Sequence, residues 1–236
     1  MREPLGVSRP SSVGGFRGRG VPDRSFSLVI FDYDGVLADS LDHAVLVGEE
    51  FCRSVSHGRA PTRESIGALE VMTYPEIARS VGLPSEQVDR FSSYAFERFR
   101  ELSRSISFFP GVESLLRRAS TKKLAIVSGN SGEVIRAKLA SRDLARTVTC
   151  ILGAFEPGDK ADKIRGACEH FGIDAGLACM VGDSASDIRH AKNAGVVSIA
   201  ATWGWQSRDM LSKENPDFVV DSVRELADLI VSGDSR

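Results

Sequence analysis

The sequence contains few cysteines and histidines, four of each in 236 residues. No pair of cysteines has CxxC spacing, and no histidines have the spacing of an HExxH metal motif. The surroundings of the cysteines are apolar, which favours buried free thiols over disulfides or metal ligands. A zinc site and a disulfide framework are therefore not expected, and free thiols suit the reducing cytoplasm.

Long apolar runs and long basic stripes are also missing. No uninterrupted apolar segment approaches the roughly 20 residues that a membrane-spanning helix needs. Lys and Arg total 30 against 32 Asp and Glu, and this balance gives no reason to expect nucleic-acid binding. The 42% of hydrophobic residues suffices for one large domain or a domain with an insertion. We expect a cytoplasmic, monomeric protein that binds neither membranes nor nucleic acids.

Residues 1–25 differ from the rest of the chain. They are rich in Gly, Pro, Ser and Arg and show no helical periodicity, so we expect a disordered tail. Several arginines and few acidic residues leave a transit peptide as an alternative. The segment has no apolar stretch typical of a secretory signal.

From residue 26 onward, apolar strand patterns alternate with helical patterns. Strands are expected at 27–33, 124–130, 147–153, 178–183 and 196–201, and helices at 131–142, 162–172, 185–195 and 222–231. Glycines follow two of these helices, at Gly172 and Gly195, as is common at helix ends. The alternation predicts an α/β fold with a mainly parallel, Rossmann-like sheet.

Residues 39–109 interrupt this alternation. They contain no convincing strand, and helical patterns cover 40–55, 64–72, 73–82 and 85–106. Pro110 and Gly111 mark the return to the α/β pattern. The sequence therefore predicts a helical cap at 39–109, inserted into an α/β core formed by 26–38 and 110–236.

Polar residues gather where the predicted strands end. They are Asp32, Asp34, Ser128 and Asp183, with Asp187 one helical turn further on. Ligands of open parallel sheets bind beyond the carboxyl ends of the strands, so these side chains are expected in one cleft. Several carboxylates cannot stay ionised together without a cation, and oxygen ligands of this kind suit Mg²⁺.

Other residues near these strand ends suit a phosphate group. Ser128 and the backbone amides of residues 129–131 stand at a helix start and form a candidate phosphate cradle. Lys160 and Lys163 precede the strand that ends at Asp183 and can compensate negative charge. A metal, phosphate donors and a carboxylate nucleophile together point to phosphoryl transfer through an aspartyl-phosphate.

Three stretches resemble motifs of the haloacid dehalogenase superfamily. FDYDGVLADS at 31–40 resembles the first motif, VSGN at 127–130 the second, and VGDSASD at 181–187 the fourth. For the motif lysine we favour Lys160, in GDKADKI, over Lys163, although the proline that often follows this lysine is missing. A helical cap between the first and second motifs resembles the phosphoglycolate phosphatase and β-phosphoglucomutase subgroup.

The resemblance implies a role for each matching residue. Asp32 would be the nucleophile and Asp34 the general acid and base. Mg²⁺ would be held by Asp32, the backbone carbonyl of Asp34, Asp183 and Asp187, the last as a ligand or as support. The transferred phosphoryl group would be bound by Ser128, Gly129, Asn130 and Lys160.

Several further residues have structural interpretations. Asp39 and Ser40 are expected to support a turn or cap a helix. The arginines at 98, 100 and 104 are expected on a solvated helix face, with contact to an anionic substrate as the alternative. Mutase relatives keep a histidine in the first cap helix, but that slot matches Ala44, with His43 one position early. Trp203 and Trp205 are expected to pack a loop near the site.

These observations favour one function over two others. Asp34 disfavours dehalogenases and phosphonatases of the superfamily, which have no aspartate at its position. We expect a Mg²⁺-dependent phosphatase acting on a small phosphomonoester, either phosphoglycolate-like or a sugar phosphate. The alternatives are a sugar-phosphate mutase of the β-phosphoglucomutase type and, on the same fold, a non-catalytic binding protein.

Overall fold

A computed structural model describes residues 25–231, so almost all of the expected tail at 1–25 lies outside the described residues. Six parallel strands form one sheet in the order β3-β2-β1-β4-β5-β6. The strands are β1 Leu28–Phe31, β2 Lys123–Val127, β3 Cys150–Leu152, β4 Ala178–Gly182, β5 Val197–Ala201 and β6 Phe218–Val220. The strand order reverses between β1 and β4, the place where such sheets bind ligands. The predicted α/β class and parallel sheet are confirmed.

Both faces of the sheet are covered by helices, which explains why its central strands are apolar throughout. In β1, Leu28 and Ile30 belong to the apolar cluster that includes α7 Lys160–Phe171 and α8 Ala185–Ala194. Val29 and Phe31 belong to the other cluster, with α5 Val112–Arg118, α6 Gly132–Ala140 and α10 Val223–Val231. The short helix α9 Arg208–Lys213 packs against α8 and β5 through a third, small cluster.

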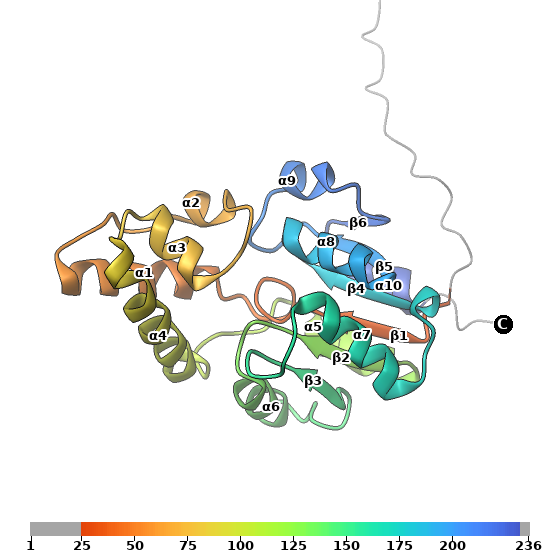
Figure 1. The fold of residues 1–236 in the computed structure, drawn as a ribbon. Helices are drawn as coiled ribbons and strands as arrows, with labels where there is room; N and C mark the ends of the chain where they lie inside the picture. Colours follow the sequence, from red (N-terminus) through yellow and green to blue (C-terminus); the bar gives the residue numbers. More distant parts are fainter. Residues whose placement is uncertain (1–24, 232–236) are drawn as a thin grey trace, which may run out of the picture.

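Four helices are inserted between β1 and α5, and Figure 1 shows them grouped to one side of the sheet. They are α1 Leu41–Val55, α2 Arg63–Gly67, α3 Tyr74–Ser80 and α4 Ser85–Leu102. The chain enters and leaves this insertion side by side, because the Asp39 amide donates to Ser107 O and the Phe109 amide to Leu37 O, each at 2.9 Å. No helix among residues 25–231 is long and apolar enough to cross a membrane.

Two details of the helices differ from the sequence prediction. The helix expected at 64–72 ends at Gly67, and residues 68–73 form a loop before Thr73 caps α3. Gly67 lies against the core here, since a Cβ at this position would lie 2.7 Å from the Trp205 carbonyl oxygen. The helices α5 and α9 were not predicted, because seven and six residues are too few to show a clear helical period.

Candidate active site

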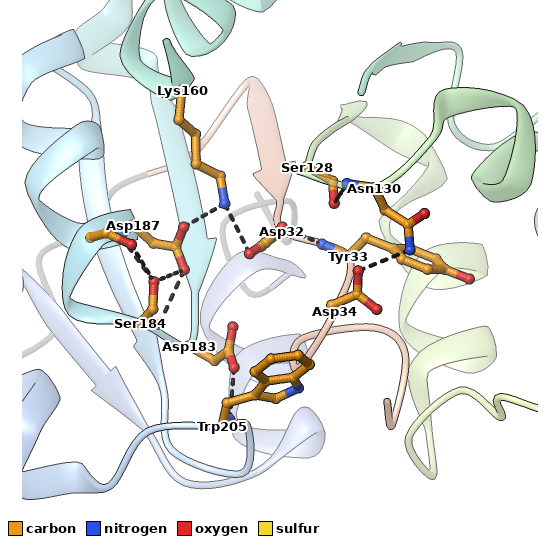
Figure 2. Close-up of polar contacts among 11 residues, drawn as sticks. Asp32, Tyr33, Asp34, Ser128, Asn130, Lys160, Asp183, Ser184, Asp187 and Trp205 are labelled. Carbon is orange, nitrogen blue, oxygen red and sulfur yellow. Dashed lines mark hydrogen bonds and ion pairs between the residues drawn. The ribbon is translucent and has the colours of Figure 1, made fainter. Parts of the chain in front are cut away.

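The carboxyl ends of β1 and β4 bring three aspartates together (Figure 2). Asp32 follows β1, Asp183 follows β4, and Asp187 lies in the first turn of α8. Each offers a carboxylate oxygen, and these oxygens all lie within 4.8 Å of one another. Residues separated by about 150 positions in sequence therefore share one cluster, which we call the carboxylate cluster.

Two glycines make room for Asp183 in the carboxylate cluster. A Cβ at Gly35 would lie 1.9 Å from Asp183 Oδ2, and one at Gly204 would lie 2.5 Å from the same atom. Gly35 also has φ +78°, a left-handed conformation that glycine adopts without strain. The Asp183 carboxylate is held there by the Trp205 amide, which donates to Oδ2 at 2.7 Å. The glycine of the first motif thus fits both the turn and the packing of an aspartate from another strand.

Lys160 neutralises part of the carboxylate cluster. Its Nζ lies 2.8 Å from Asp32 Oδ2 and 2.5 Å from Asp187 Oδ1 (Figure 2). The side chain comes from the first turn of α7, which is fixed by a capping box between Asp159 and Asp162. Lys163 points elsewhere, since its Nζ donates to the Gly153 carbonyl at 2.6 Å. Of the two lysines considered from the sequence, Lys160 is the one that contacts the aspartates.

Asp187 takes part both in the capping box of α8 and in the ion pair with Lys160. Its Oδ2 accepts hydrogen bonds from the Ser184 amide at 3.1 Å and hydroxyl at 2.7 Å, which closes the capping box of α8. Its Oδ1 faces Lys160, and the residue is 1% exposed. Asp187 therefore does not face solvent.

Burial and crowding shift the proton affinities of these groups. Burial first, and then the neighbouring carboxylate of Asp187, raise the pKa of Asp32 to about 7 although Lys160 opposes the shift. Burial, Asp187 and Asp32 raise the pKa of Asp183 well above its usual value. Burial lowers the proton affinity of Lys160, but the carboxylates of Asp187 and Asp32 outweigh it and raise its pKa. One lysine thus leaves the cluster with excess negative charge.

Asp34 lies apart from the carboxylate cluster, beside the loop after β2. The Asn130 side-chain amide donates to Asp34 Oδ2 at 3.0 Å (Figure 2). The other oxygen, Oδ1, is buried and has no hydrogen-bond partner among residues 25–231. Burial raises the pKa of Asp34, which favours a proton on this carboxyl group.

The loop from Ser128 to Ser131 uses most of its amides internally. The Asn130 amide donates to Ser128 Oγ at 3.1 Å, and the Ser131 amide donates to Asn130 Oδ1 at 2.7 Å. The Gly129 amide has no partner in the described part of the chain and is the one available for a ligand. Of the amides at 129–131 that the sequence suggested as phosphate donors, those of Asn130 and Ser131 are thus already used within the loop.

The residues present fit a divalent metal. Three carboxylates converge after two strand ends, and all of them offer hard oxygen donors. Such donors suit Mg²⁺, which uses few carboxylates and keeps several waters. A metal ion in this place would favour the ionised forms of Asp32 and Asp183 and so oppose the burial and repulsion that raise their pKa values.

A cavity of about 390 Å³ opens over the carboxylate cluster. The core side includes Asp32, Asp34, Ser128, Lys160 and Asp183. The inserted helices contribute residues of the segment 71–77, which consists of the end of the α2–α3 loop and the start of α3. All residues predicted for the site thus line one cavity, together with part of the insertion.

Comparison with known proteins identifies the family. The family model of haloacid dehalogenase-like hydrolases matches residues 29–201, which is most of the chain. The chain belongs to the haloacid dehalogenase-like hydrolase family. It is therefore an enzyme, and the idea of a non-catalytic binding protein receives no support.

Individual relatives agree with this family. The chain is 31% identical over 218 residues to a phosphoglycolate phosphatase of Neisseria meningitidis, covering 84% of this chain and 91% of the relative. It is 25% identical over 200 residues to a phosphoglycolate phosphatase of Synechococcus elongatus, with 84% and 94% covered. A haloacid dehalogenase-like hydrolase structure from Streptococcus pneumoniae has the same fold, with TM-score 0.77, 20% identity, and 85% and 96% of the two chains covered.

Some site residues of this family member were missed by the sequence analysis. His190 lines the cavity three residues after Asp187, a spacing that places both on one face of α8 and could have indicated it. The lining residues of the segment 71–77 carried no such signal. Trp205 also lines the cavity, whereas the Trp203 ring donates to Val36 O at 3.2 Å and packs the loop as expected.

Other candidates do not reach the cavity. Arg98 forms ion pairs with Glu50 and Glu101, and Arg100 pairs with Glu97. Neither they nor Arg104 belong to the cavity lining, so the solvated-face interpretation fits them better than a substrate contact. His43 faces Ser105 Oγ at 3.3 Å, and no histidine of the described insertion lines the cavity.

Proposed function

We propose that this hydrolase is a Mg²⁺-dependent phosphatase that releases phosphate from a small phosphomonoester through an aspartyl-phosphate on Asp32. The proposal rests above all on one arrangement. A nucleophile candidate, Asp32, lies in ion-pair contact with Lys160, while Asp34, two residues further on, is held by Asn130. The names of the relatives from Neisseria and Synechococcus support the same reaction type.

Mg²⁺ would be held by Asp32, Asp183 and the backbone carbonyl of Asp34, with Asp187 as a further ligand or as support for Lys160. When bound, the ion would neutralise the carboxylate cluster and allow the dianionic phosphate to approach. Lys160, the Ser128 hydroxyl and the Gly129 amide would bind the phosphoryl oxygens, with Asn130 shaping this loop. These donors stabilise the charge that spreads over those oxygens during transfer.

In the first half-reaction, a carboxylate oxygen of Asp32 forms a bond to phosphorus and the bond from phosphorus to the ester oxygen breaks. The carboxyl proton of Asp34 passes to that oxygen, and a neutral alcohol leaves. Burial raises the pKa of Asp34, which lines the cavity, and this suits a group that carries a proton to the ester oxygen. The product is phosphate bonded to Asp32.

In the second half-reaction, Asp34 takes a proton from a water molecule as that water attacks the phosphorus. The bond from phosphorus to Asp32 breaks, inorganic phosphate leaves, and Asp34 is protonated again for the next cycle. We further propose that residues 39–109 act as a cap that excludes bulk water during transfer.

Phosphate release from a panel of small phosphomonoesters, measured with Mg²⁺, with EDTA and with the Asp32→Asn variant, tests the proposal. We expect turnover that needs the metal and falls by at least about 10³-fold in the variant, which lacks the nucleophile. An isomerisation that needs a bisphosphate primer and releases little phosphate would replace the phosphatase with a mutase. The mutase alternative is disfavoured because the described insertion places no histidine in the cavity.

A further inference from the structure

The segment 71–77 gives the cavity an uncharged wall. Its lining residues are four apolar side chains and two hydroxyl side chains, namely Val71, Met72, Pro75, Ile77, Thr73 and Tyr74. Met72, Tyr74 and Pro75 are half-buried, so they are in place beside the cavity rather than extended into solvent. We call these six residues the neutral wall.

The positive charges near the cavity are all on the core side. Lys160 is already paired with Asp32 and Asp187, and the Nζ of Lys163 is bonded to the Gly153 carbonyl. The nearest arginine in the sequence of the insertion, Arg79, pairs with Glu76 and does not line the cavity. Among the described residues, the insertion therefore offers no cation to a substrate.

The neutral wall is fixed to the core by hydrogen bonds from buried or paired groups. Gln206, which is 1% exposed, donates to the Leu69 carbonyl at 2.5 Å. Arg189 donates to the Glu70 carbonyl at 2.8 Å while its other nitrogen pairs with Glu214. The two residues just before the wall are thus attached to the core, which makes the wall a built part of the cavity.

We infer that the substrate is a phosphomonoester whose leaving group is an uncharged alcohol with an apolar body, and not a carboxylate-bearing alcohol such as glycolate. This inference rests on the proposed phosphatase function. A carboxylate against the neutral wall would lose its hydration without gaining an ionic partner. An alkyl group in the same place would gain from removing apolar surface from water.

The sharpest test compares two esters of similar size and opposite polarity. Isobutyl phosphate and 2-phosphoglycolate are both phosphates of primary alcohols, and they differ in two methyl groups against two carboxylate oxygens. We expect kcat/KM for isobutyl phosphate to exceed that for 2-phosphoglycolate by at least tenfold in the Mg²⁺-loaded wild-type protein. Equal values, or a preference for 2-phosphoglycolate, would overturn the inference.

A charge placed on the wall tests which side of the cavity holds the leaving group. Met72→Lys is expected to lower kcat/KM for isobutyl phosphate and to raise it for 2-phosphoglycolate, shifting their ratio at least tenfold. Leu46→Lys puts the same charge on an exposed site of α1 outside the cavity and should leave the ratio unchanged. The same shift in both variants would contradict a specific role of the wall.

The core side needs its own variant, because His190 lines the cavity and its Nδ1 has no partner within residues 25–231. If 2-phosphoglycolate is preferred and His190→Gln abolishes that preference, the leaving group binds the core and the inference is wrong. If no ester releases phosphate in a Mg²⁺-dependent manner, the proposed phosphatase fails, and the inference fails with it. Mg²⁺-dependent phosphatase activity that is highest with 2-phosphoglycolate would overturn this inference and leave the proposed phosphatase function standing.

Discussion

The side chain of Asn130 donates a hydrogen bond of 3.0 Å to Asp34, joining two motifs that lie 96 residues apart. Asn130 is itself held in place by two hydrogen bonds. Its side-chain Oδ1 accepts from the Ser131 backbone amide, and its backbone amide donates to Ser128 Oγ. The loop from Ser128 to Ser131 thus orients the side chain of Asp34, the proposed general acid. Oδ1 of Asp34 is buried and stays unpartnered among the described residues.

We therefore predict that Asn130→Leu impairs proton transfer more than binding. For an alkyl phosphate, kcat should fall by about 10–100-fold, a part of the 10²–10⁴-fold that a general acid supplies. p-Nitrophenyl phosphate has a leaving group that needs no proton, so its kcat should fall much less. Steady-state kinetics on both esters separates the effects. An equal loss on both would mean that Asn130 acts on phosphate binding rather than through Asp34.

The motif aspartates could be predicted from sequence because their signals are local. Asp32 directly follows an apolar strand, and Asp187 follows a serine cap at capping-box spacing. The contacts of Gln206 could not be predicted, since its hydrogen bond to Leu69 spans 137 residues and depends on how the insertion folds back. The contact of Gly67, the last residue of α2, with the Trp205 carbonyl could not be predicted either, because it joins distant parts of the chain.

The carboxylate cluster predicts an unusual pH dependence of stability in metal-free protein. The pKa of Asp32 rises from 3.8 unfolded to about 7 folded, and that of Asp183 is also raised, so the folded state binds these protons more tightly. Stability from these groups is present below pH ~4 and is lost as pH rises to about 7. We expect the free energy of unfolding to fall by about 1–3 kcal/mol between pH 5 and pH 8.

Denaturant unfolding at the two pH values, with EDTA and with Mg²⁺, checks this expectation. Mg²⁺ at a hundredfold excess over its Kd should restore about 2.7 kcal/mol at pH 8. Asp183→Asn should reduce both the pH dependence and the gain from Mg²⁺. Stability that rises steadily from pH 5 to pH 8 in EDTA would show that the carboxylates are not strained against one another.

Gln206 connects the segment just before the neutral wall to the helix that carries Asp187. Its Nε2 bonds the Leu69 carbonyl and its Oε1 accepts from the Ala185 amide at 2.6 Å. Gln206→Ala leaves both backbone groups without this partner and should cost about 1–3 kcal/mol of stability. We also expect faster proteolysis within residues 68–73 and a higher KM for the preferred ester.

The chain offers a matched control for this variant. Gln87 is the other glutamine, and it accepts a single bond from Arg90 at 3.0 Å on the surface of α4. Gln87→Ala should change stability by less than about 0.5 kcal/mol. Limited proteolysis and chemical unfolding compare the two variants. A Gln206→Ala protein that resists protease as wild type does would show that the loop is held by Arg189 alone.

Lys138 fixes the place where the insertion returns to the core. This α6 residue is 6% exposed, and its ammonium group donates to the carbonyls of Ser103, Arg104 and Ile106. The nitrogen also lies 5.9 Å from the centre of the Phe108 ring. A single side chain thus binds three carbonyls of the segment that follows α4.

We predict that Lys138→Met destabilises the protein by about 1.5–3 kcal/mol, because hydrogen bonds from a charged donor are lost while the buried Ile106 carbonyl loses its ammonium partner. Burial lowers the pKa of Lys138, which shows that removing its charge from water offsets part of the energy of these hydrogen bonds. Arg136→Met on the exposed side of the same helix is the control and should change stability by less than about 0.5 kcal/mol. Thermal and denaturant unfolding give the comparison. If the two variants are equally stable, the return segment is held by the pairing of residues 37–39 with 107–109, and Lys138 contributes only its aliphatic chain.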